Sequence, residues 1–172
     1  MAENRLEALK QALKMEEDGK AYYERARETT TNKMGKKIFA SLVKAEEAHI
    51  RKIKELHASI EETGAWPDQV PYGDDVQITK NIFTEAMSDV EKNVGGTADD
   101  LEALKLAATM ETKGKKFYDS QAEATDDPFE KKFYLLLAHE EGAHFISILD
   151  TIQFLEDPQA YYHQMEITKG FH

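Results

Sequence analysis

Two Glu-x-x-His motifs contain residue types at a spacing that suits metal binding. Glu46 precedes His49 in the first motif, and Glu141 precedes His144 in the second. Residues three apart project from the same face of a helix, so each motif offers a carboxylate and an imidazole to one point. A further glutamate lies 30 residues before each motif glutamate. The six candidate side chains are Glu16, Glu46, His49, Glu111, Glu141 and His144.

These six side chains fall where a helical core normally has apolar residues. A buried carboxylate costs several kcal/mol unless it is paired, protonated or bound to metal. One Glu from each of two helices and one Glu-x-x-His from each of two others form a two-metal site in a four-helix bundle. Two divalent cations would balance the four carboxylates. A lone Glu-x-x-His is more often a surface pair or a satisfied core histidine, but its repetition favours a dimetal site.

Helical hairpins would bring the four carboxylates to one level. Leu6, Leu9, Leu13 and Tyr23 share a helical face with Glu16, at steps of three, four and seven residues. If the turns lie near residues 31 and 126, each of the four glutamates lies 15 residues from its turn. Equal arms of an antiparallel pair then place all four at mid-bundle.

An internal repeat supports the two hairpins. Residues 6–61 align without gaps over residues 101–156, with 21 identities in 56 positions. LEALK occurs at the start of both copies, and Met15-Glu16-x-x-Gly19-Lys20 recurs as Met110-Glu111-x-x-Gly114-Lys115. Two copies of one helical hairpin explain this pattern better than coincidence does.

The elements predict a single all-α domain, a ferritin-like four-helix bundle with one long crossover. We expect hairpins at 3–63 and 97–157, a crossover at 64–96 and a C-terminal tail at 158–172. Asn32, Thr97 and Asp127 are expected to start helices, and Gly64 to end one. The tail contains Pro158 and little regular pattern, so we expect no fifth core-capping helix. The apolar spacing within the crossover predicts a short amphipathic helix through Ile78, Ile82, Phe83, Met87, Val90 and Val94.

Composition excludes several classes of function. The 172 residues have 22 Lys+Arg and 33 Asp+Glu, a net charge of −11 that argues against nucleic acid and anionic membranes as partners. No cysteine is present, which excludes thiolate zinc sites, iron–sulfur clusters and cysteine nucleophiles. Metal must therefore bind through histidine and carboxylate. No secretory signal and no membrane-spanning run is visible, so we expect a cytoplasmic location.

Other residues lie close to the predicted site. Tyr23 and Tyr118 follow Glu16 and Glu111 by seven residues, where they either pack in the core or donate a hydrogen bond to a ligand. Mid-helix glycines at 19 and 114 serve close helix packing or leave room for a small ligand. Three more glutamates lie about 100° around the helix from the candidates, in solvated or outer-ligand positions. They are Glu17, Glu47 and Glu140.

The sequence resembles the rubrerythrin-like branch of the ferritin-like superfamily over roughly residues 3–157. The matching stretches are MEEDGKAYY (15–23), LVKAEEAHIRKI (42–53), METKGKKFY (110–118) and LLLAHEEGAHFISIL (135–149). The resemblance implies a non-haem diiron site that reacts with hydrogen peroxide or O₂. It assigns the iron ligands to the six candidate side chains, with Tyr23 and Tyr118 as the tyrosines that support the ligands.

The chain departs from rubrerythrins in two respects. It has no Cys₄ iron of the rubredoxin type, so we expect an external electron donor such as a rubredoxin. Rubrerythrins also carry a further Glu where this chain has Gly114, which leaves a symmetric six-ligand site similar to the ferroxidase centre of bacterioferritin. Bacterioferritin has a haem-binding Met where this chain has Glu47.

These features predict a dimetal oxidoreductase, with iron favoured and manganese or zinc as alternatives, since ligand type alone does not select the metal. The substrate would be peroxide or O₂, and the protein a homodimer. The alternatives are a ferroxidase that stores iron in a cage and a non-catalytic metal-binding protein. A long crossover would also allow helix exchange between two chains.

Overall fold

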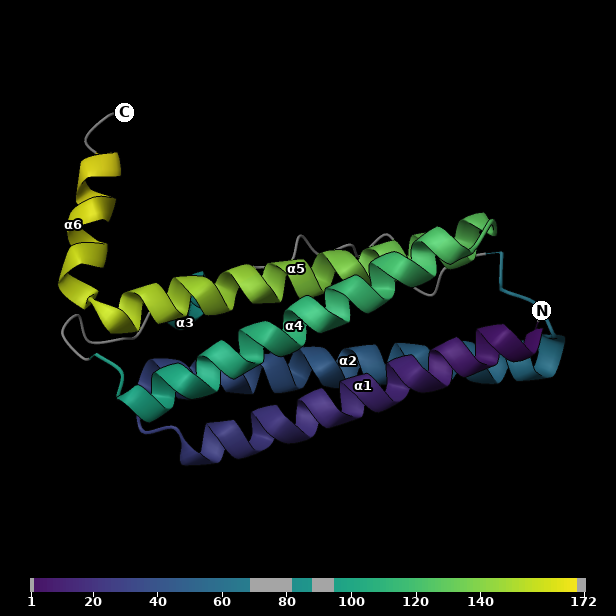
Figure 1. Cartoon of the computed structure of the whole chain (residues 1–172), viewed down its shortest axis with the longest axis horizontal. Helices are drawn as coiled ribbons and strands as arrows, with labels where there is room; N and C mark the ends of the chain where they lie inside the picture. Colours follow the sequence, from purple (N-terminus) through teal and green to yellow (C-terminus); the bar gives the residue numbers. More distant parts are fainter. Residues whose placement is uncertain (1, 69–81, 88–94, 170–172) are drawn as a thin grey trace.

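The computed structural model describes residues 2–68, 82–87 and 95–169, and all regular structure in these ranges is helical. Four long helices form an elongated bundle (Figure 1). One shorter helix lies between the second and third long helices in the chain, and another follows the fourth. The helices are α1 (Ala2–Thr29), α2 (Lys33–Thr63), α3 (Ile82–Met87), α4 (Ala98–Ala124), α5 (Pro128–Glu156) and α6 (Pro158–Lys169).

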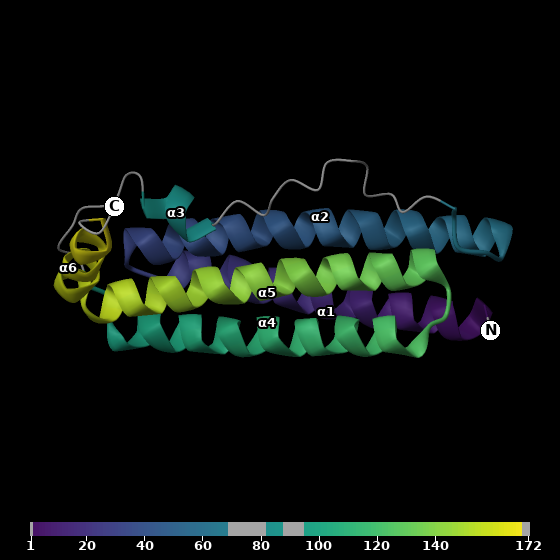
Figure 2. The same ribbon diagram turned by 90° about the horizontal axis from the view of Figure 1, so that it is seen from above.

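The long helices pair as the predicted hairpins. Helices α1 and α2 pack along each other, as do α4 and α5, and the hairpins meet through α1 with α4 and α2 with α5. Helices α2 and α4 run in the same direction, so α2 ends and α4 begins at opposite ends of the bundle (Figure 2). This is the predicted all-α bundle with one long crossover.

Local sequence explains where the helices begin and end. The Asn32 side chain accepts hydrogen bonds from the backbone N–H groups at 34 and 35, at 2.8 and 3.2 Å. Thr97 begins α4 in a capping box with Asp100, and Asp127 caps α5 with a proline in its first turn. Gly64 ends α2 with φ 73°, in the left-handed region that glycine tolerates. All four predicted helix ends are confirmed.

The crossover contains the predicted short helix, in part. Ile82, Phe83 and Ala86 of α3 are buried, and α3 packs against α2 and α5. The predicted apolar positions Ile78, Val90 and Val94 lie outside the described residues.

The C-terminal tail is helical, although its irregular pattern did not indicate a helix. Residues 158–169 form α6, which turns away from the bundle axis at the end of α5 (Figure 1). The Asp157 carboxylate accepts a hydrogen bond from the Ala160 backbone N–H at 2.9 Å, so Pro158 begins a helix instead of preventing one. Tyr161 packs edge-on against Phe154 and Phe83, at ring-centroid distances of 5.6 and 5.5 Å, which holds α6 on α5 and α3.

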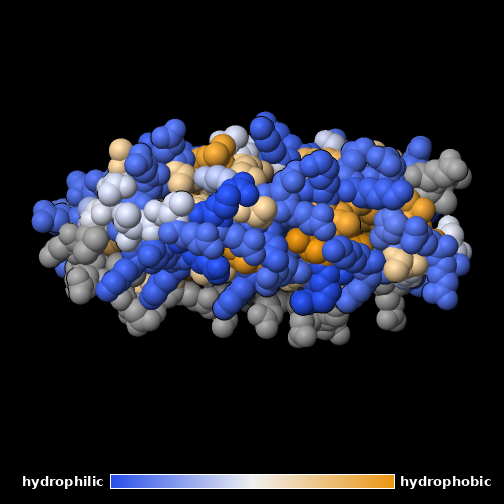
Figure 3. Space-filling model, turned by 90° about the horizontal axis from the view of Figure 1, so that it is seen from below, coloured by the Kyte–Doolittle hydropathy of each residue, from blue (hydrophilic) through white to orange (hydrophobic). Residues whose placement is uncertain are grey.

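The apolar core of the bundle consists of two clusters. One lies toward the α1–α2 turn and includes Tyr23, Ile38 and Ile148, and the other lies toward the α4–α5 turn and includes Tyr118 and Ile53. The outer face in Figure 3 is largely hydrophilic, with smaller hydrophobic areas. None of the described helices combines the length and apolar composition that a membrane crossing needs. The predicted polar side chains lie between the two clusters.

Candidate metal centre

The four long helices each bring one predicted carboxylate to the middle of the bundle. Glu16 lies on α1, Glu46 on α2, Glu111 on α4 and Glu141 on α5, and each is at most 4% exposed. The two histidines of the motifs join them from α2 and α5, at 1% and 3% exposure. The structure thus brings together all six side chains that the sequence singled out.

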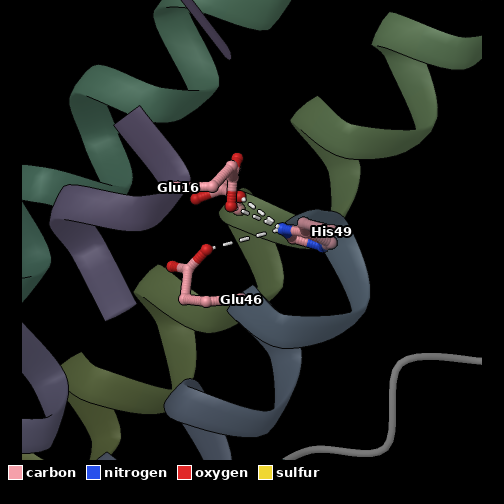
Figure 4. A group of neighbouring side chains, drawn as sticks. Glu16, Glu46 and His49 are labelled. Atoms are coloured by element: carbon pink, nitrogen blue, oxygen red, sulfur yellow. Dashed lines mark hydrogen bonds and ion pairs between the residues drawn. The ribbon is translucent and has the colours of Figure 1, made fainter. Parts of the chain in front are cut away.

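His49 faces three carboxylates through one ring nitrogen. Its Nδ1 lies 3.0 Å from Glu16 Oε2, 3.3 Å from Glu141 Oε1 and 3.8 Å from Glu46 Oε2. Figure 4 shows the carboxylates of Glu16 and Glu46, which come from α1 and α2, pointing toward the His49 ring. These four residues offer ligand atoms that all lie within 4.8 Å of one another.

A second group of ligand atoms adjoins the first. It consists of Glu111, Glu141 and His144, whose ligand atoms also lie within 4.8 Å of one another. His144 Nδ1 lies 3.4 Å from Glu111 Oε2, and the rings of His49 and His144 stack with centroids 5.8 Å apart. Because Glu141 belongs to both groups, two cations could share its carboxylate.

Tyr23 and Tyr118 connect the hairpins through hydrogen bonds to the cluster. The Tyr23 hydroxyl on α1 donates to Glu111 Oε1 on α4 at 2.7 Å. The Tyr118 hydroxyl on α4 donates to Glu16 Oε1 on α1. Each tyrosine therefore orients the glutamate of the opposite hairpin, as outer partners of metal-binding carboxylates do.

The pKa values of the carboxylates shift in opposite directions within each hairpin. Burial and the neighbouring charge of Glu16 raise the pKa of Glu46 well above its usual range, and burial with Glu111 does the same for Glu141. Burial also acts to raise the pKa of Glu16, but the charge of His49 lowers it to about 2. Burial also acts to raise the pKa of Glu111, but hydrogen bonding with Glu141, the charge of His144 and the hydrogen bond from Tyr23 together lower it. One glutamate per hairpin is thus a proton site that a metal ion can occupy instead.

Several buried atoms of the cluster have no hydrogen-bond partner among the described residues. They are one oxygen each of Glu46, Glu111 and Glu141, and Nδ1 of His144. Buried polar atoms without a partner cost about 1–3 kcal/mol each. Oxygen and imidazole donors converging without partners fit bound divalent cations.

A small cavity of about 30 Å³ opens beside the carboxylates. An added Cβ at Gly19 would lie 3.3 Å from Glu46 Oε1, and one at Gly114 would lie 3.0 Å from Glu141 Oε2. The glycines therefore keep a space beside the cluster, which favours the second of the two roles expected for them. The cavity is lined by Met15, Glu16, Gly19, Tyr23, Glu46, Met110, Gly114 and Glu141.

The three other glutamates near the candidates differ in their contacts. Glu17 and Glu47 are exposed and pair with Lys54 and Lys20, at 3.3 and 3.2 Å. Glu140 is half-buried on α5, and its Oε2 lies 2.5 Å from His49 Nε2 on α2. Sequence spacing could place Glu140 near the site, but it could not show which side chain Glu140 contacts.

Comparison with known families agrees with this geometry. The chain matches the rubrerythrin family model over residues 7–93, half of its length. The chain belongs to the rubrerythrin family. No match to a curated protein or to a solved structure was found. Rubrerythrins are ferritin-like, as the bundle is, and the family implies a dimetal carboxylate site that the buried cluster fits.

Proposed function

We propose that this rubrerythrin-family chain is a non-haem diiron oxidoreductase that reduces hydrogen peroxide or O₂ with electrons from a separate donor. The observation that supports this most strongly is the buried cluster itself. Four carboxylates and two histidines converge on the bundle axis, and several of their ligand atoms have no hydrogen-bond partner among the described residues.

In this proposal two cations are held in two positions that share one carboxylate. Four glutamates and two divalent cations sum to zero charge, so metal binding removes the electrostatic cost of burying the acids. The six proposed ligands are Glu16, Glu46, His49, Glu111, Glu141 and His144.

The remaining residues orient the ligands and admit the substrate. Tyr23 and Tyr118 each hold one carboxylate by a hydroxyl hydrogen bond. The cavity beside Gly19 and Gly114 is large enough for a molecule the size of water or peroxide. When bound, two ferrous ions supply the two electrons that reduce the O–O bond of hydrogen peroxide to water. Iron is preferred over zinc because zinc does not change its oxidation state.

The electrons would come from a donor outside these 172 residues. The 172 residues contain no cysteine and so cannot form the Cys₄ iron of a rubredoxin. A small redox protein such as a rubredoxin is the proposed donor, and a cytoplasmic homodimer is the proposed state of the protein.

A ferroxidase with iron storage is the second candidate function. The observation that favours it is Gly114, which supplies no carboxylate where rubrerythrins carry a further Glu. Since α6 exists, the lack of a further helix no longer argues against a storage cage. Light scattering separates the two candidates by size, because a dimer has a far smaller mass than a many-subunit cage.

Stopped-flow mixing of the ferrous-loaded protein with hydrogen peroxide tests the proposed function. We expect iron oxidation that is faster than that of free Fe²⁺ in the same buffer. Glu47→Gln is the matched control, because it removes an exposed acid next to Glu46 and should keep the wild-type rate. Oxidation no faster than free Fe²⁺ would contradict the proposal.

A further inference from the structure

The two ring nitrogens of His49 have different carboxylate neighbours. Nδ1 faces the cluster, 3.0 Å from Glu16 Oε2, whereas Nε2 contacts Glu140 Oε2 at 2.5 Å. A neutral imidazole has a single N–H, and a carboxylate only accepts hydrogen bonds. When a cation in the cluster takes the lone pair of Nδ1, the single hydrogen of the neutral ring lies on Nε2, where Glu140 accepts it.

The other histidine has no equivalent carboxylate in the repeat. The alignment that superimposes His49 on His144 superimposes Ala45 of α2 on Glu140 of α5. An alanine methyl group cannot accept a hydrogen bond. The two hairpins thus repeat the six proposed ligands but do not repeat this outer contact.

The two hairpins also differ in a charged residue near Glu140. Lys52 on α2 carries a positive charge that acts on the Glu140 carboxylate. The repeat places Ser147 at the position equivalent to Lys52, where no charge is present. The second hairpin therefore does not repeat the positive charge of Lys52 near Glu140.

The ligand groups themselves are also unequal. The His49 group contains three carboxylates, those of Glu16, Glu46 and Glu141, whereas the His144 group contains those of Glu111 and Glu141. A larger number of charged ligands binds a divalent cation more tightly, and an outer partner that orients the imidazole adds to that affinity.

We propose that Glu140 is a positioning residue that orients His49 through its Nε2–H and makes the two metal positions unequal, so that the His49 position binds its cation first. This inference rests on the proposed dimetal site. Outer hydrogen-bond partners of metal-binding histidines typically contribute about 10–100-fold to metal affinity. We expect a contribution of that size at the His49 position and none at the His144 position.

Titration of the metal-free chain with Co²⁺, followed by visible absorption, tests this asymmetry. The wild type should bind two Co²⁺ ions in two separable steps. Glu140→Ala should weaken the tighter step by about 10–100-fold and leave the weaker step unchanged. Glu140→Gln keeps the size of the side chain and a neutral acceptor, so it should produce a smaller loss in the same step.

Two further variants separate the contact from general effects of charge or packing. Glu47→Ala removes an acid next to Glu46 that pairs with Lys20, and it should change neither step. Ala45→Glu supplies a carboxylate at the equivalent position, and it should tighten the weaker step.

A proton resonance provides a readout that a merely structural role would not change. In the Co²⁺-loaded wild type, the Nε2–H of His49 should give a slowly exchanging, paramagnetically shifted signal. Glu140→Ala should remove that signal through faster exchange with water. Equal weakening of both steps, or no change in either, would overturn the role of Glu140. A wild type that fails to bind two Co²⁺ ions would instead overturn the dimetal site itself.

Discussion

At the level of single residues, the close approach of Gly114 to Glu141 predicts how Gly114→Ala changes metal affinity and stability. In Gly114→Ala the new Cβ would lie 3.0 Å from Glu141 Oε2, so the carboxylate must shift. We expect metal affinity to fall by about tenfold, the lower end of the effect of disturbing a ligand's surroundings. The metal-free protein should be no less stable, because alanine favours a helix over glycine by about 0.5–1 kcal/mol. Cation titration and thermal unfolding measure the two effects.

Gly142→Ala is the matched control for that change. Gly142 follows Glu141 directly, but its added Cβ would lie 3.6 Å from Lys115 Cε, an ordinary contact. This variant should gain helix stability and keep wild-type metal affinity. Equal metal affinity in the two alanine variants would show that the space beside Glu141 is unimportant.

The hydrogen bond from the Tyr23 hydroxyl to Glu111 leads to a second prediction about metal affinity. Tyr23→Phe removes the 2.7 Å hydrogen bond to Glu111, and a hydrogen bond to a charged group contributes about 1.5–3 kcal/mol. We expect metal affinity to fall by about 10–100-fold, measured by the same cation titration. Tyr22→Phe is the control, because the Tyr22 hydroxyl donates to the Ala103 carbonyl and does not touch the cluster. Similar losses in both variants would contradict a role for Tyr23 in orienting Glu111.

The proposed ligands could be found from sequence because their spacing repeats. Glu16 and Glu46 lie at equal distances from one turn, and the 95-residue shift supplies the second pair. The Glu140–His49 contact could not be found in this way. It joins residues 91 apart on different hairpins, so it depends on how α5 packs against α2.

At the level of elements, capping residues explain both the success and the failure of the sequence prediction. Asp127-Pro128 was expected to begin α5 and does so. Asp157-Pro158 has the same pattern and begins α6, although the irregular spacing after Pro158 does not indicate a helix. The apolar spacing of the tail is too irregular to indicate a helix. Contacts of Tyr161 with Phe154 and Phe83 stabilise α6 instead.

Asp100 ties the start of α4 to the turn between α1 and α2. Its carboxylate accepts hydrogen bonds from the Thr31 backbone N–H and hydroxyl, both at 3.0 Å, and from the Thr97 backbone N–H at 3.2 Å. We expect Asp100→Ala to lower the free energy of unfolding by about 1.5–3 kcal/mol, measured by urea denaturation near neutral pH. Asp99→Ala is the control, since exposed Asp99 should contribute only about 0.3–1 kcal/mol through the helix dipole.

The effect of Asp100→Ala should depend on pH. Burial acts to raise the pKa of Asp100, but hydrogen bonds from Thr31 and Thr97 lower it below its ordinary value of 3.8. A lowered folded-state pKa stabilises the protein above the ordinary value, and this contribution is lost as the pH falls through the folded-state pKa. The difference between wild type and variant should therefore shrink below about pH 4. An unchanged difference between pH 6 and pH 3 would contradict this account.

At the level of the whole molecule, metal removal should cost stability. Four of the 33 acidic residues are confined in the central cluster, and cations that bind only the folded state stabilise it. At a free cation concentration of 100 times Kd, each site contributes about 2.7 kcal/mol. For a chain of this size, each kcal/mol corresponds to about 2–4 °C in Tm. Calorimetry with and without a chelator should show the lower Tm in the metal-free protein, and equal Tm values would contradict metal binding in the core.

Anomalous diffraction at the iron edge, from crystals grown anaerobically with Fe²⁺, tests the central claim most directly. The account predicts two peaks inside each bundle. One should lie among Glu16, Glu46, His49 and Glu141, and the other among Glu111, Glu141 and His144. A map with no peak between these side chains, or with iron bound only at surface carboxylates, would contradict the account.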